Sequence, residues 1–126
     1  MIKGLGVDIA EIDRIHSITS RYSSRFLNRI YTSKEIDYCK TPNNSFRFSS
    51  LAARFAAKEA FYKAVFPMVR HSIPWHSCEI INDSEGVPQI RVSKDLKEEL
   101  NDPQILLSLS HSDKYAVAIV IIESLT

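Results

Sequence analysis

The chain has 126 residues, of which 44% are hydrophobic and 25% charged, and its formal net charge is +1. These proportions are typical of a globular protein and exclude disordered and collagen-like chains. This length fits one domain with its own core, so we treat residues 1–126 as a single domain. The longest apolar run, residues 115–122, is far shorter than the roughly 20 residues of a transmembrane helix. No membrane association is expected.

The cysteines and the first residues bear on the compartment. Cys39 and Cys78 form no Cys-x-x-Cys pair and have no histidine at a spacing suited to zinc. Neither a disulfide framework nor a structural zinc site is therefore expected. Asp8, Glu11 and Asp13 interrupt the apolar stretch that a signal peptide would need. The sequence predicts a cytoplasmic protein.

Charge is distributed unevenly along the chain. Residues 1–70 hold 12 Lys or Arg against 6 Asp or Glu, and residues 71–126 hold 4 against 9. The positive first part predicts an anionic partner, which could be nucleic acid, an acidic protein or a phosphorylated small molecule. Nucleic acid is the least favoured, because the chain has no basic tail, aromatic stacking platform or known reader motif.

The first predicted element is a strand over residues 2–12, where apolar residues alternate loosely with other types. Gly4 and Gly6 lie near its start, and glycine in a strand permits a ligand or another backbone to approach closely. A helix is predicted from Asp13, as its N-cap, to about Arg29, since apolar residues recur every three or four positions.

Two further helices follow. Thr32 and Glu35 have the spacing of a capping box, which predicts a short helix through Cys39. The next helix is the longest and is predicted to start near residues 46–50. It is expected to end before Pro67, because proline disfavours helical geometry in the residue that precedes it.

The rest of the chain is predicted to form strands and one short helix. The expected elements are an extended segment at 73–75, strands at 78–81 and 87–92 around a turn at 82–86, a helix capped by Ser93 through Leu100, and a hairpin of strands at 105–111 and 115–122. Together with the first strand, they predict an α+β fold: a largely antiparallel sheet packed with one long and several short helices.

Two carboxylates on separate elements form the first candidate site. Asp8 lies within the first strand, where a buried carboxylate without a partner would be costly. Glu59 and Lys63 lie one turn apart on the long helix, and by themselves they would indicate an exposed ion pair. Asp8 and Glu59 together offer the oxygen ligands that Mg²⁺ takes when it also holds substrate phosphates. We therefore predict a Mg²⁺ site for a phosphorylated ligand.

Basic residues near these carboxylates are candidates for binding phosphate. Arg54, Lys58 and Lys63 recur along the same helix and could neutralise phosphate charge, although each alone would be an ordinary solvated side chain. His111 follows a serine-rich segment and could donate to a phosphate or act as a base, whereas an isolated histidine is more often structural. A serine hydrolase is not predicted, because no Gly-x-Ser-x-Gly elbow is present.

A basic ridge is predicted on the second element. Arg14, Arg21 and Arg25 are spaced by seven and four residues, so on a continuous helix they share one side with Ile18. This side is either a solvated face or a surface for the acidic helix of a partner protein.

Residues 4–15 and 54–64 resemble the two signature segments of the holo-acyl-carrier-protein synthases, the small-subunit class of phosphopantetheinyl transferases. The similarity extends to residues 107–112 and the strand after them. The resemblance implies an enzyme of fatty acid biosynthesis that transfers 4'-phosphopantetheine from coenzyme A to a serine of apo-acyl carrier protein and releases 3',5'-ADP. It also implies the fold of these transferases and a homotrimer with active sites between subunits.

The resemblance assigns catalytic roles to three residues. Asp8 and Glu59 would bind Mg²⁺ together with the pyrophosphate of coenzyme A. Glu59, or a water on the metal, would accept the proton of the carrier serine. Lys63 would stabilise or protonate the leaving phosphate.

The resemblance also assigns binding roles. Arg54 and His111 would contact the phosphate and adenylate part of coenzyme A, assisted by Lys58. The acidic helix of the carrier protein would meet a basic and aromatic surface made of Arg14, Arg21 and Phe26.

One segment departs from the family pattern. Family members usually continue after the long helix with a glycine-containing loop that helps to enclose the coenzyme, whereas residues 66–71 contain no glycine. Side-chain contacts from Arg70 or His71 would then replace backbone contacts. Two other functions stay open on the sequence: a noncatalytic module that binds carrier proteins, and a Mg²⁺-dependent nucleotide phosphohydrolase.

Overall fold

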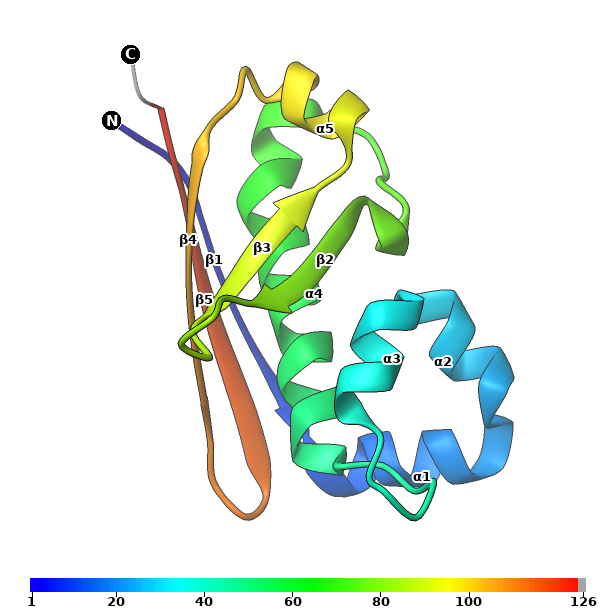
Figure 1. Ribbon diagram of the computed structural model, residues 1–126. Coiled ribbons are helices and arrows are strands. Elements are labelled where there is room, and N and C mark those ends of the chain that lie inside the picture. Colours follow the sequence, from blue (N-terminus) through cyan, green and yellow to red (C-terminus); the bar gives the residue numbers. More distant parts are fainter. Residues whose placement is uncertain (125–126) are drawn as a thin grey trace.

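The computed structural model describes residues 1–124 and has the predicted α+β fold (Figure 1). In chain order the elements are β1 (Ile2–Glu11), α1 (Ile12–Tyr22), α2 (Ser24–Ile30), α3 (Ser33–Cys39), α4 (Phe48–Val69), η1 (Trp75–Ser77), β2 (Cys78–Asn82), β3 (Pro88–Val92), α5 (Lys94–Glu99), β4 (Gln104–His111) and β5 (Tyr115–Glu123). Within the described residues, no helix combines the length and apolar character that crossing a membrane requires.

Three antiparallel strands form the larger sheet in the order β1-β5-β4, and β2 pairs with β3 in a separate hairpin. Helix α4 lies along one face of the larger sheet, and the hairpin and helices α1 to α3 pack on the other side of α4 (Figure 1). Alternate residues of a strand point to opposite faces. One set of β5 side chains is therefore buried against α4, namely Ala116, Ala118, Val120 and Ile122.

The two glycines of β1 allow the strand and α4 to approach backbone to backbone. A Cβ atom at Gly6 would lie 1.9 Å from the carbonyl oxygen of Ala60, and one at Gly4 would lie 2.1 Å from that of Ala64. Both distances are far below van der Waals contact, so only glycine fits at either position. The predicted close approach at these glycines is confirmed, and it places the inner face of β1 directly beside α4.

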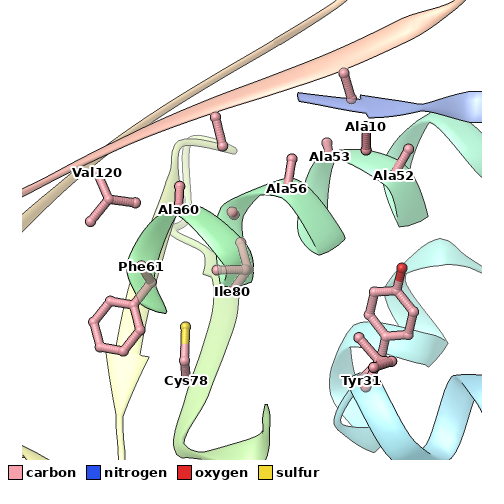
Figure 2. Close-up of a cluster of buried hydrophobic side chains, with 14 of the residues drawn as sticks. Ala10, Tyr31, Ala52, Ala53, Ala56, Ala60, Phe61, Cys78, Ile80 and Val120 are labelled. Carbon is pink, nitrogen blue, oxygen red and sulfur yellow. The ribbon is translucent and has the colours of Figure 1, made fainter. Parts of the chain in front are cut away.

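Helix α4 is buried on two sides, not along a single stripe. Figure 2 shows Ala56 and Ala60 on the side of the helix that faces Val120 of the sheet. Phe61 points the other way, toward Cys78 and Ile80 of β2. Since the hairpin and the short helices cover this second side, charged residues on it are also buried. Glu59 and Lys63 lie between the two buried sides, where the helix is partly exposed.

The predicted helix over residues 13–29 is wrong in one respect, because it is broken at Ser23. Ser23 has a φ of 51°, and its N–H donates to the carbonyl of Thr19 to end α1. The break turns α2 so that Leu27 and Ile30 enter the core. The N-cap of α1 is Glu11 rather than Asp13. Arg14 and Arg21 remain on one helix, whereas Arg25 belongs to α2, so the predicted continuous ridge of three arginines is not formed.

The predicted end of the long helix is also wrong, because Pro67 lies inside α4. Helical geometry continues through Val69, where Met68 and Val69 pack against the core. A proline removes one backbone donor, and this apolar packing offsets the loss. The helix ends at Arg70, which adopts the left-handed conformation (φ 58°, ψ 27°) that glycine usually provides. The segment predicted as extended at 73–75 leads instead into the η1 turn.

Candidate active site

Asp8 lies on the α4 side of β1, between Gly6 and Ala10, and faces the middle of the helix. Lys63 Nζ lies 3.0 Å from Asp8 Oδ1 and also donates to the carbonyl of Val7 at 3.1 Å. The lysine therefore forms an ion pair across two elements. The local pair with Glu59 that helical spacing would favour is replaced by this longer-range contact.

Glu59 is half-buried in α4, close to both members of this ion pair. Its pKa is raised above the ordinary value, first by burial and then by the negative charge of Asp8, while Lys63 partly opposes the shift. The carboxylates of Asp8 on β1 and Glu59 on α4 therefore repel one another. A cation placed between them would relieve this repulsion.

Asp8 and Glu59 line a common cavity of about 450 Å³, here called the Asp8 cavity. Arg14 and Phe26, predicted to meet the carrier protein, line the same cavity. Arg21 lies outside it, in a neighbouring shallow hollow that shares Ile18 with the Asp8 cavity. The fold therefore brings two of the three predicted carrier-binding residues to the carboxylates.

A second cavity, of about 210 Å³, lies on the other side of Glu59 and is here called the Trp75 cavity. Its lining is largely apolar and includes Tyr62, Ile73, Pro74 and Trp75. Trp75 is held by stacking on Phe55, with ring centroids 5.7 Å apart. Sequence patterns predict only an extended segment at 73–75 and no functional role for it. Because Glu59 lines both cavities, this residue lies at the boundary between them.

Arg54 and Lys58 lie on the second buried side of α4, away from Asp8. The Nη2 atom of Arg54 donates to Asn82 Oδ1 at 2.7 Å, and its guanidinium lies over the ring of Tyr38. Among residues 1–124, the buried Nε atom of Arg54 has no hydrogen-bond partner. The ammonium group of Lys58 pairs with buried Glu35 at 2.9 Å.

Neither His111 nor the glycine-free segment lines the Asp8 cavity or the Trp75 cavity. His111 ends β4 and is exposed, and its Nδ1 lies 3.3 Å from the carbonyl oxygen of Ser112. In the glycine-free segment, Arg70 Nε donates to the carbonyl of Pro67, and His71 Nε2 lies 2.7 Å from Glu99 Oε2. The backbone carbonyl of Ser72 and the carboxylate of Glu99 raise the pKa of His71. Arg70 and His71 therefore bind within the chain rather than reach toward either cavity.

The donor set at the Asp8 cavity fits a hard divalent cation that keeps open coordination positions. Asp8 and Glu59 supply carboxylate oxygens, and the described residues contain no group of three or more acidic, histidine or cysteine side chains arranged for a metal. Two carboxylates with waters and substrate oxygens suit Mg²⁺, which is seldom enclosed by protein ligands alone. The residues present therefore fit a Mg²⁺ that is bound together with a phosphate group.

Comparisons with known proteins identify the family. A family model described as the 4'-phosphopantetheinyl transferase superfamily matches residues 4–120. The holo-acyl-carrier-protein synthase of Chloroherpeton thalassium is 45% identical over 119 residues, which cover 94% of this chain and 96% of the relative.

Solved structures give the same result. The crystal structure of the synthase from Neisseria meningitidis matches with a TM-score of 0.84 and 31% identity, covering 98% of this chain and 100% of that one. The synthase from Bacillus anthracis in complex with CoA (3',5'-ADP) matches with a TM-score of 0.78 and 33% identity, covering 98% of both chains. The chain therefore belongs to the 4'-phosphopantetheinyl transferase superfamily and, within it, to the holo-acyl-carrier-protein synthase family.

Proposed function

We propose that this protein transfers 4'-phosphopantetheine from coenzyme A to a serine of apo-acyl carrier protein, releasing 3',5'-ADP, in support of fatty acid biosynthesis. The observation that carries the proposal is the position of Glu59, between an apolar cavity on one side and a cavity lined by Asp8, Arg14 and Phe26 on the other. Such an arrangement accommodates two substrates that meet at one carboxylate. The coenzyme complex of the Bacillus anthracis relative supports the assignment of the donor.

Asp8 and Glu59 are the residues that would hold Mg²⁺. When bound, Mg²⁺ would neutralise the negative charge of the coenzyme's pyrophosphate. Glu59 accepts the proton of the serine hydroxyl, and its raised pKa brings its basicity closer to that needed near neutral pH. Lys63, held at Asp8, donates to the phosphate that leaves. Positioning and charge neutralisation thus supply most of the catalysis.

Carrier-protein binding is proposed for the surface made of Arg14, Arg21 and Phe26. Arg14 and Phe26 stand at the rim of the Asp8 cavity, and Arg21 lies on the same helix as Arg14. A carrier helix rich in acidic residues would pair with the two arginines while its serine enters the cavity. Arg54 and His111 are proposed to bind the phosphate and adenylate part of coenzyme A. The free, buried state of Cys39 and Cys78 is compatible with the cytoplasmic location we propose.

A homotrimer is proposed because the outer face of the larger sheet is apolar. Leu5 is 63% exposed, Val7 54% and Ile9 62%, and the same face carries Leu106, Tyr115, Val117 and Ile119. The solvent face of an antiparallel sheet is usually polar, and a contiguous apolar patch marks an interaction surface. His111 lies apart from Glu59 within one chain, and packing of three copies through this face would let it serve the site of another copy.

Replacing Ile119 by glutamate should convert the assembly into monomers, because a charge at the middle of the apolar face would be buried without a partner. Sedimentation equilibrium measures the mass, with three chains expected for the unaltered protein. Gln89→Glu, which adds a charge at an exposed position of β3, is the control and should leave the mass unchanged. A trimeric Ile119→Glu variant would show that this face does not join the copies.

Incubation with coenzyme A, Mg²⁺ and purified apo-acyl carrier protein should add the phosphopantetheine arm to the carrier, as measured by intact-protein mass spectrometry. EDTA should stop the reaction, and excess Mg²⁺ should restore it. An authentic synthase serves as control that the carrier is competent. No mass gain with a carrier that the control modifies would contradict the proposal, and release of 3',5'-ADP without carrier would instead indicate a phosphohydrolase.

A further inference from the structure

A buried ion pair lies behind the Trp75 cavity. Glu35 of α3 is 0% exposed and Lys58 of α4 is 3% exposed, and Lys58 Nζ lies 2.9 Å from Glu35 Oε1. The backbone N–H groups of Thr32 and Ile80 also donate to the Glu35 carboxylate, at 2.8 and 2.7 Å. This carboxylate is therefore bound by donors from the N-cap of α3, from α4 and from β2.

The ammonium group of Lys58 is equally occupied. Besides Glu35, it donates to the carbonyl oxygen of Trp75 at 3.0 Å and to that of Cys78. An ammonium group has three hydrogens, so each one has an acceptor inside the protein. The side chain is 1% exposed and has no donor left for a phosphate.

These bonds connect the residue next to Glu59 with a wall of the Trp75 cavity. Lys58 directly precedes Glu59 in α4, and both Trp75 and Cys78 line the cavity. Within the described residues, the hydrogen bond from Lys58 to Trp75 is the one that joins the η1 turn to α4, and the bond to Cys78 joins the start of β2 to the same helix. Lys58 thereby fixes the position of Glu59 relative to the part of the cavity lining formed by Trp75 and Cys78, here called the Trp75 wall.

Stability alone is a poor explanation for this ion pair. Desolvation of two buried charges offsets most of their attraction, and an apolar pair of similar volume is often as stable. Neighbouring buried positions on the same side of α4, Phe61 and Val65, are apolar. An apolar side chain at position 58 would fill the space but would not bind the carbonyl groups of Trp75 and Cys78. The specific effect of the pair is to fix their positions.

We propose that Glu35 and Lys58 are positioning residues that hold the Trp75 wall in place to receive coenzyme A, a role that rests on the function proposed above. Lys58 acts through the carbonyl group of Trp75 and does not touch the coenzyme. This assignment replaces the direct coenzyme contact that the family resemblance implies for Lys58.

The test compares Glu35→Gln, Lys58→Met and the charge-neutral double variant with Arg91→Met, which breaks the ion pair between the exposed Arg91 side chain and Glu79 on the β2–β3 hairpin. For each protein, KM is measured for coenzyme A and for the carrier, Kd for 3',5'-ADP by calorimetry, and Tm by scanning. The double variant should raise both the KM for coenzyme A and the Kd for 3',5'-ADP by at least about tenfold, because the Trp75 wall is displaced. KM for the carrier and all constants of Arg91→Met should be unchanged.

Glu35→Gln distinguishes a positioning role of Lys58 from direct contact with the coenzyme. The variant keeps the ammonium group of Lys58 but weakens the bond that fixes its position. A raised KM for coenzyme A in this variant supports positioning, and an unchanged KM in a folded protein overturns it, whatever the change in Tm. If the Met variants do not fold, Lys58→Arg replaces them, because it keeps the charge but alters the donor geometry. A raised KM for coenzyme A in this variant supports positioning, and an unchanged KM overturns it. Transfer by the unaltered protein is measured first, so that a failure of the proposed function is recognised separately.

Discussion

Replacing Glu59 by glutamine should lower the rate of phosphopantetheine transfer by about 10²- to 10⁴-fold, the usual effect of removing a general base. Glutamine keeps the size of the side chain and one oxygen, but it carries no charge and accepts no proton. Single-turnover mass spectrometry of the carrier measures the rate at saturating coenzyme A and Mg²⁺. The loss should therefore appear in the chemical step.

The same change should leave the folded protein at least as stable near neutral pH without metal. Since the pKa of Glu59 is raised in the folded state, this state binds the proton more tightly than the unfolded chain. The contribution of Glu59 to the free energy of unfolding therefore falls as pH rises from its ordinary pKa through the raised one. Glutamine removes this dependence. Turnover close to that of the unaltered protein, or of the exposed control Glu85→Gln, would refute the role of Glu59.

Local sequence was sufficient where one element determines its own geometry. The capping box of Thr32 and Glu35 is confirmed, because both partners are three residues apart and need no other contact. Ser93 likewise caps α5 through the N–H of Leu96. The two hairpins are confirmed because turn residues separate runs of β-branched and apolar residues.

Contacts between distant elements decided what the sequence missed. The sequence pattern favours solvent-facing positions for Arg54 and Lys58, but the β2–β3 hairpin covers their side of α4. No local sequence pattern predicts that the hairpin packs there. Glu35 showed a similar limit, since its capping role was visible while its bond to the N–H of Ile80 was not. The break at Ser23 had no signal because apolar spacing continues across it.

The pairing of Asp8 with Glu59 was predicted from two carboxylates on separate elements and from the order of the two signature segments, and not from local spacing. Helical spacing alone favoured pairing of Lys63 with Glu59, but the structure pairs Lys63 with Asp8 from β1. That contact depends on how closely β1 approaches α4. The small residues at this boundary, above all Gly6, therefore control the site as well as the core.

Replacing Gly6 by alanine should lower the free energy of unfolding by about 3 kcal/mol or more, at the upper end for an overpacked core, or prevent folding. The new Cβ atom would lie 1.9 Å from the carbonyl oxygen of Ala60 and 2.9 Å from its carbonyl carbon. These are backbone atoms in the middle of α4, so no side chain can rotate to make room. Urea unfolding followed by circular dichroism measures the loss.

Gly86→Ala is the matched control, because it introduces the same methyl group where no other part of the described chain lies within 4 Å. Gly86 has a φ of 86°, so alanine there should cost roughly 1–2 kcal/mol through backbone conformation alone. It should leave transfer unchanged, since a methyl group at this turn would touch neither β1 nor α4. Gly6→Ala differs in kind: relief of its clash must move β1 away from α4, and with it Asp8 from Glu59. Where the variant folds, transfer should fall together with stability, and a loss of stability no larger than that of Gly86→Ala would contradict the close approach of β1 and α4.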